Sequence, residues 1–130
     1  MAQKYIIGDL VRYNGKISTI RAVNRYSYED EDIVEQYSIV DEKGYAYPKI
    51  EEDEIHGIVI TFEFLEKNGF KKEGKNMFKA KYSSLEIQWF GGSNQDFVVT
   101  RNSVYLRRVV FIHQLQHLLF GLGLNSEMEV

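Results

Sequence analysis

The sequence predicts an α+β protein in which a small antiparallel barrel of the SH3-like kind, at about residues 5–58, packs with a helix–meander–helix lobe at about residues 59–130. Short alternating runs separated by turn residues fill the first sixty positions, whereas helical patterns occur only near residues 61–69 and 110–122. The chain has 130 residues, of which 44% are hydrophobic. That is enough apolar material for one domain, or for two small lobes that share a core.

The barrel begins with a hairpin around the Asn-Gly pair of "GDLVRYNGKISTIRAV", which is the strongest short-range hairpin signal. A two-residue loop would pair Tyr13 with Lys16 and place Val11 and Ile17 on opposite faces of the hairpin. A three-residue loop over residues 13–15, with the glycine left-handed at a bulge, pairs Val11 with Ile17 and keeps both inside. We therefore expect the bulged hairpin.

The rest of the barrel follows a polar stretch, "NRYSYEDEDIVE", which predicts a long loop. After it, "QYSIV", a turn at "DEKG", "YAYPKI" and "DEIHGI" predict the remaining strands. Pro48 is the only proline and cannot donate a ladder hydrogen bond. It should therefore mark an edge strand or a strand end.

The second lobe begins at Thr61, a suitable N-cap for a short helix that Asn68-Gly69 would terminate. Four alternating or apolar runs then predict a strand meander: "MFKAKY", "LEIQWF", "DFVVTR" and "SVYLRRV". The last element is a helix from about Val110 to Leu122, ended by "GLGLN". The lysines 71, 72, 75, 79 and 81 are expected on a soluble hairpin edge.

The segment "HQLQH" at residues 113–117 places two histidines four residues apart in that last helix. A structural zinc would need further ligands, for which only His56, Glu127 or Glu129 are candidates. The zinc-protease motif also requires a glutamate directly after the first histidine, and this chain has Gln114 there. We therefore expect no metal but a polar helix face opposite the core residues, or a partner-contacting face, formed by His113, Gln116, His117 and Phe120.

The remaining motifs predict no catalysis. "FGGSNQDF" lacks the Gly-Lys-Ser/Thr of a phosphate-binding loop and predicts a hairpin loop. "EDEDIVE" lacks the central glycine and ligand spacing of a calcium loop and predicts a solvated acidic loop. No serine has a histidine and an acid at the local spacing of a nucleophile site. We expect neither an enzyme nor a bound cofactor.

The charge distribution and the composition bear on where in the cell the protein is expected. The net charge is −3, but residues 29–54 carry eleven acidic and two basic residues, a local charge of −9. The chain has no cysteine, no apolar core of signal-peptide length near its start, and no apolar run near the roughly 18 residues that span a membrane. We expect a cytoplasmic protein without membrane contact.

Three segments in order, "IGDLVRYNGKI", "FLEKNGF" after "IHGIVIT", and "VFIHQLQHLLFGLGL", give the chain a resemblance to a known family. It resembles small proteins of Bacteroides-type gut bacteria and of their phages or other mobile elements. The resemblance covers most of the chain and implies a barrel-like unit followed by a helix, a few strands and a C-terminal helix. Phe62 departs from the family's usual helix-starting proline. The family has no assigned catalytic or binding residues, so none is carried over.

Together these patterns favour a noncatalytic protein-binding or adaptor module, derived from a phage or mobile element. Its partner would meet the helix face defined above or a tyrosine-bearing barrel face that includes Tyr13, Tyr26, Tyr28, Tyr45 and Tyr47. The alternative is a nucleic-acid-binding accessory protein that uses the basic hairpin residues Arg12, Tyr13, Lys16 and Arg21. The acidic block and the pI of about 5.6 count against that alternative.

Overall fold

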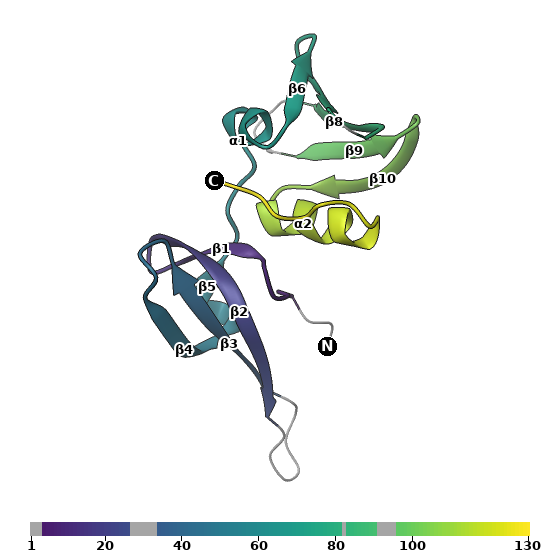
Figure 1. The fold of residues 1–130 in the computed structure, drawn as a ribbon. Coiled ribbons are helices and arrows are strands. Elements are labelled where there is room, and N and C mark those ends of the chain that lie inside the picture. Colours follow the sequence, from purple (N-terminus) through teal and green to yellow (C-terminus); the bar gives the residue numbers. More distant parts are fainter. Residues whose placement is uncertain (1–3, 27–33, 82, 91–95) are drawn as a thin grey trace. The chain divides into compact units, whose positions relative to one another are not determined.

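The computed structural model describes residues 4–26, 34–81, 83–90 and 96–130 of the chain. Two five-stranded antiparallel sheets and two α-helices make up this part of the protein, which confirms the predicted α+β class (Figure 1). The chain divides into two compact units, Met1–Ile58 and Val59–Val130, each with its own sheet. Within the described ranges, no helix has the length and apolar character needed to cross a membrane.

The first unit is a curled sheet in which the strands lie in the order β4-β3-β2-β1-β5 (Figure 1). Its strands are β1 (Leu10–Tyr13), β2 (Lys16–Tyr26), β3 (Val34–Asp41), β4 (Ala46–Glu51) and β5 (Ile55–His56), with a 3₁₀ turn, η1 (Glu52–Glu54), before β5. One face of the sheet is buried, and its core consists of Tyr5, Val11, Ile20, Tyr37, Ile39, Ile50 and Ile55.

The hairpin between β1 and β2 closes with a two-residue loop, so the predicted bulged hairpin is wrong. Asn14 and Gly15 have φ angles of 50° and 76°, as a type I′ turn requires at both central positions, and Tyr13 pairs with Lys16 across the loop. The twist of such a turn matches the twist of the flanking strands. That local preference outweighs the burial of one more isoleucine.

A serine consequently takes the core position that the bulged hairpin would have given to Ile17. Ser18 lies opposite Val11, is buried, and donates its hydroxyl hydrogen to the carbonyl of Lys16 at 3.3 Å. Ile17 faces the other side, where it pairs with Arg12 and is only half-buried. Satisfying the hydroxyl internally limits the cost of burying a polar group at this position.

Strands β3 and β4 form the second hairpin, and the turn predicted at "DEKG" is confirmed. The amide of Gly44 donates to the carbonyl of Asp41 at 3.0 Å, and Gly44 has a φ of 87°. Pro48 lies in β4, an edge strand, as predicted. The β3–β4 register shifts between Tyr37 and Ile39, opposite Pro48 and Lys49, and Lys49 has a φ of 59°.

The long polar loop was predicted over residues 24–35, but β2 extends to Tyr26 and β3 begins at Val34. The intervening residues 27–33 lie outside the described part. They include Tyr28 and most of "EDEDIVE". The loop predicted for "FGGSNQDF" falls largely on residues 91–95, which also lie outside it.

The second unit contains α1 (Phe62–Lys67), the strands β6 to β10 in the order β10-β9-β8-β7-β6, and α2 (Ile112–Gly121) (Figure 1). The strands are β6 (Phe70–Glu73), β7 (Met77–Ala80), β8 (Leu85–Trp89), β9 (Phe97–Arg101) and β10 (Val104–Val109). Strand β6 was not predicted, because after Phe70 it has three exposed charged residues and therefore no apolar alternation.

Helix α1 confirms the predicted N-cap. The amide of Phe64 donates to the Thr61 hydroxyl oxygen at 3.1 Å, and Gly69 follows the helix with a φ of 88°. Phe62, at the first helical position, places its ring 5.1 Å from that of Phe78 and 5.3 Å from that of Trp89. Phe62 is therefore a packing residue of this unit.

Candidate binding surfaces

The "HQLQH" segment lies in α2, and two of its four polar side chains are buried. His113 and Gln116 are each only 4% exposed, so the prediction that they belong to a solvent-facing polar side of the helix is wrong for these two residues. The His113 ring stacks on that of Phe111, with centroids 5.7 Å apart. The Gln116 amide donates to the carbonyl of Ser126 at 3.1 Å, so the segment after the helix covers this side of it.

The side chain of Gln114 caps the N-terminus of α2. Its side-chain carbonyl accepts hydrogen bonds from the amides of Val110 at 2.8 Å and Phe111 at 3.1 Å. Amides before and within the first turn have no intrahelical acceptor, so this side chain satisfies two groups that would otherwise lose their hydrogen bonds. This cap explains why the helix begins at Ile112 and not at Val110 as predicted.

His117 and Phe120 remain on the outer side of α2. His117 is half-buried, and its ring meets that of His113 edge to face at 5.7 Å. Phe120 is 68% exposed. Of the four residues predicted to form one partner-contacting face, the structure therefore presents Phe120 fully and His117 in part.

The four residues of the basic hairpin do not share one face. Because Tyr13 and Lys16 pair directly across the strands, their side chains point to one side, whereas Arg12 belongs to the opposite side. Arg21 lies at the register shift of β2, between Ile20 and Ala22. The structure thus brings together Tyr13 and Lys16, of which Lys16 takes part in the cluster described next.

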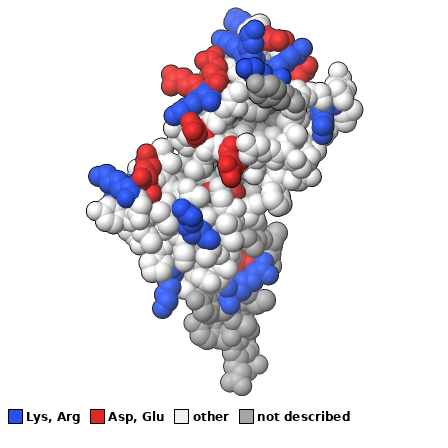
Figure 2. Space-filling view, viewed as in Figure 1, with Lys and Arg blue, Asp and Glu red and all other residues white. Residues whose placement is uncertain are grey.

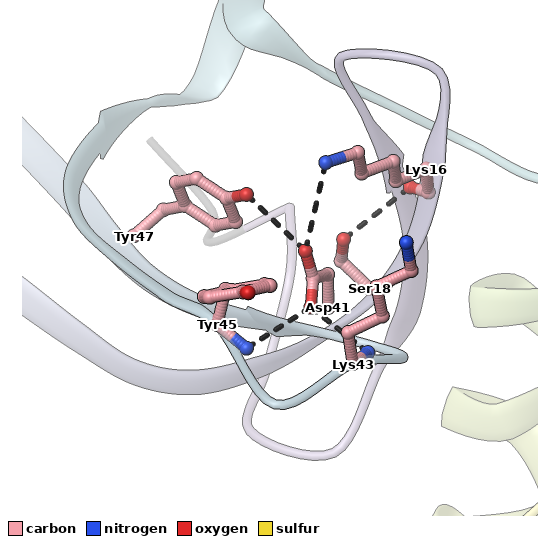
Figure 3. Close-up of polar contacts among 6 residues, drawn as sticks. All are labelled: Lys16, Ser18, Asp41, Lys43, Tyr45 and Tyr47. Carbon is pink, nitrogen blue, oxygen red and sulfur yellow. Dashed lines mark hydrogen bonds and ion pairs between the residues drawn. The ribbon is translucent and has the colours of Figure 1, made fainter.

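Asp41 is the centre of a polar cluster at the end of the β3–β4 hairpin (Figure 3). Its side chain is only 2% exposed. One carboxylate oxygen accepts the amides of Lys43 and Tyr45, both at 3.0 Å, and the other accepts the Tyr47 hydroxyl at 3.2 Å. The ammonium of Lys16 lies 3.9 Å away, so one carboxylate fastens the turn, a tyrosine and the first hairpin together.

These contacts set the ionisation of Asp41. Burial alone would raise the pKa of its carboxyl group. The hydrogen bonds from the Tyr45 and Lys43 amides and the Tyr47 hydroxyl, together with the charge of Lys16, outweigh burial and hold the pKa below its usual value. The carboxylate is therefore charged at neutral pH and engaged by its neighbours.

Three tyrosines beside this cluster form what we call the tyrosine surface: Tyr13, Tyr45 and Tyr47. The rings of Tyr13 and Tyr47 lie 5.3 Å apart, and both residues pack against the core while remaining partly exposed. Tyr45 is 62% exposed. Asp41 fixes the backbone of Tyr45 and the hydroxyl of Tyr47, so the surface is held in place by hydrogen bonds as well as by packing (Figure 3).

Two other tyrosines of the first unit belong to the core. Tyr5 and Tyr37 are fully buried, with ring centroids 5.6 Å apart, and the Tyr5 hydroxyl donates to the carbonyl of Ile55. Burial, reinforced by the charges of Glu52 and Asp9, raises the pKa of Tyr5 to about 12. Both phenols therefore stay neutral across the physiological range and serve the fold.

Charges of both signs are interspersed on the face of the molecule seen in Figure 2. On the β6–β7 hairpin, Lys79 pairs with Glu73 at 3.2 Å and with Glu86 at 3.6 Å, and the Lys72 ammonium lies 5.4 Å from the centre of the Phe62 ring. These ion pairs partly neutralise the positive charge of the hairpin lysines. They therefore count against binding of a phosphate backbone, which requires uncompensated positive charge.

Among the described residues, no three histidine, aspartate or glutamate side chains gather as metal ligands would. Comparison with known proteins adds no further constraint on these surfaces: no protein-family model, curated protein or solved structure matches the chain.

Proposed function

We propose that the chain is a noncatalytic protein-binding module, and that its tyrosine surface receives an extended segment of a partner protein. The observation that carries this proposal is the exposed ring of Tyr45 beside the Tyr13–Tyr47 pair, on a hairpin that the buried Asp41 locks. Tyrosines give large, rigid contact areas at low entropic cost, and preorganisation reduces the cost of binding. The lone pairs of Asp41 are used within the fold, which favours recognition over acid–base chemistry.

The strand order supports the finer assignment of this unit as an SH3-like barrel. Strands β1 to β4 follow one another as neighbours, and β5 returns through a 3₁₀ turn to pair with β1. This order is typical of SH3-like barrels. SH3 domains, which have this architecture, recognise proline-rich segments in the polyproline II conformation through grooves lined with aromatic side chains, and we extend that binding mode to this chain by analogy of fold alone.

Charge favours a basic partner segment. Residues 1–58 contain twelve acidic and seven basic residues, a net charge of −5, whereas residues 59–130 contain seven acidic and nine basic residues, a net charge of +2. A proline-containing segment with arginine or lysine would complement the first unit, and such complementarity raises association rates and specificity. From the resemblance noted above, we place the module among the accessory proteins of phages or mobile elements.

The test is selection of extended peptides, with and without proline and basic residues, from a displayed library on the immobilised full chain. The affinity of selected peptides is then measured by fluorescence anisotropy. Tyr45→Ala should weaken binding about ten-fold, because truncation of an aromatic anchor typically costs more than about 1 kcal/mol. Tyr105→Ala is the matched control, since Tyr105 is also 62% exposed but lies in the second unit.

Equal affinities for the Tyr45→Ala variant and the unaltered chain would exclude the tyrosine surface. A parallel measurement with single- and double-stranded oligonucleotides covers the alternative partner class. Binding that falls steeply with salt and is lost on Lys16→Ala would replace protein recognition by nucleic-acid recognition.

A further inference from the structure

The segment that follows α2 lies in an extended arrangement along the second unit (Figure 1). From Leu124 to Glu129 its residues alternate between partly buried and exposed, with Leu124, Ser126 and Met128 on the inner side. An alternation with a period of two residues is that of a β-strand with one face covered. We call residues 124–130 the strap.

Side chains of both helices and their ends hold the main chain of the strap. Gln116 donates to the carbonyl of Ser126 at 3.1 Å. Asn68 donates to the carbonyl of Glu129 at 2.7 Å and accepts the amide of the same residue at 2.8 Å. These bonds are made to backbone groups, so they do not depend on the side chains of the segment they hold.

An apolar pocket of about 280 Å³ lies beside the strap, and its lining includes the exposed strap residues Asn125 and Glu127. Its lining includes Phe70 from β6, Leu85 from β8 and Leu119 from α2, together with Leu124 and Met128 of the strap itself. The strap therefore leaves part of this pocket unfilled. A segment with larger apolar side chains at the same alternate positions would bury more apolar surface there.

We propose that this groove is a binding site for an extended segment of a partner protein with apolar residues at alternate positions, and that the strap is the resident segment which the partner displaces. Backbone-directed hydrogen bonds combined with pockets for alternate side chains are the general means of recognising an extended peptide. The resident strap shows which chemistry the groove accepts. Because it is tethered, it competes at an effective concentration in roughly the millimolar range and keeps the site closed to weak ligands.

The groove belongs to the second unit, so this proposal is independent of the tyrosine surface. The contacts of Asn68 with Glu129, and that of the Lys67 ammonium with the carbonyl of Val130 at 2.8 Å, are solvent-exposed. Exposed hydrogen bonds of this kind exchange readily with water. The end of the strap is thus the part that opens first.

The experiment uses the full chain and a fluorescent peptide with the sequence of residues 123–130, GLNSEMEV, read by anisotropy. Met128→Asp in the chain should expel the strap and raise affinity for the peptide at least about ten-fold above that of the unaltered chain. Asn102→Asp adds the same charge at an exposed turn of the second unit that does not line the groove, and aspartate tolerates the φ of 51° there as asparagine does, so it should leave affinity unchanged.

A second pair of measurements tests the geometry. The peptide with aspartate in place of its methionine should bind the Met128→Asp chain at least about ten-fold more weakly than the original peptide. Glu129→Pro removes the backbone N–H that donates to the Asn68 side chain, so it should also open the groove. This variant replaces Met128→Asp in the experiment if Met128→Asp prevents folding. Equal peptide affinity for the unaltered chain and a folded open variant would overturn the proposal. Concentration-dependent dimers of the unaltered chain that exchange straps would also overturn it, because the occupant would then be a second copy.

Discussion

The two glutamines of α2 should respond in opposite ways to the same substitution. The Gln114 side chain accepts two hydrogen bonds, from the amides of Val110 and Phe111, whereas the Gln116 side chain donates one to the carbonyl of Ser126. Gln→Glu keeps an acceptor and removes a donor. At Gln114 the change preserves the cap and adds a negative charge near a helix N-terminus, which is favourable by about 0.3–1 kcal/mol. At Gln116 it abolishes the contact.

The magnitudes follow from burial. Gln114 is half-buried, and at about 0.5–1.5 kcal/mol for each of its two hydrogen bonds, Gln114→Ala should lower the free energy of unfolding by about 1–3 kcal/mol. Gln116 is almost completely buried, so an introduced carboxylate would be desolvated and would lose the hydrogen bond to Ser126, at a cost of roughly 2–4 kcal/mol. That cost should begin to shrink as the pH falls below roughly 6–7 and should vanish near the unfolded carboxyl pKa of about 4.3, because a protonated carboxyl group can again donate to Ser126.

Urea denaturation followed by tryptophan fluorescence measures these changes, because Trp89 in β8 is the only tryptophan and reports the second unit. The expected order of unfolding midpoints is Gln114→Glu at or above the unaltered chain, then Gln114→Ala, then Gln116→Glu. If Gln114→Glu destabilised the unit as much as Gln114→Ala, the capping role assigned to Gln114 would be refuted. A Gln116→Glu loss independent of pH would refute the donor role assigned to Gln116.

Three further substitutions test the fold and the clusters. Asp41→Asn should lower the thermal midpoint of the first unit at pH 7. The native pKa of Asp41 is depressed, so its stabilisation is present above the unfolded value near 3.8 and is lost as pH falls through the native pKa; the difference between the two chains, followed by circular dichroism, should therefore disappear in acid. Phe62→Ala should cost roughly 2–3 kcal/mol in the tryptophan-detected transition and shift the emission of Trp89, because the two rings are in contact; an unchanged spectrum would contradict that contact. Gly15→Ala should cost about 1 kcal/mol, because φ is 76° there, and an unaltered melting curve would argue against the type I′ turn.

Local signals account for the parts of the fold that the sequence predicted correctly. Thr61 needs only an amide three residues away to cap α1, and the Pro48 ring excludes a central strand whatever surrounds it. Features that depend on another segment were missed. Strand β6 pairs through its backbone while its three charged side chains stay exposed, so no apolar pattern revealed it.

The same distinction between local signals and contacts with another segment applies to the candidate sites. An aspartate at the start of "DEKG" is a readable signal for a side chain that accepts a backbone amide two residues further on, so the bond between Asp41 and the Lys43 amide was open to prediction. The contact of Asp41 with Tyr47 depends on the β3–β4 register, and its contact with Lys16 depends on the β1–β2 hairpin, whose loop length the apolar pattern predicted wrongly. The burial of Gln116 depends on the strap, which the helical periodicity of α2 cannot reveal.

Because residues of "HQLQH" have structural roles, they are poor choices for a test of partner binding at the helix face. His113 is buried, Gln114 caps the helix and Gln116 holds the strap, so substitutions at these positions would reduce binding at any surface of the second unit by disturbing the fold of that unit. Loss of binding in such variants is therefore no evidence for a helix-face interface. Of the four residues predicted to form the helix face, Phe120 gives the direct test of that face, because its exposed ring can be truncated at little expected cost to folding. A Phe120→Ala chain that folds normally and binds normally would leave the tyrosine surface and the strap groove as the two surfaces to distinguish, and they lie in different units.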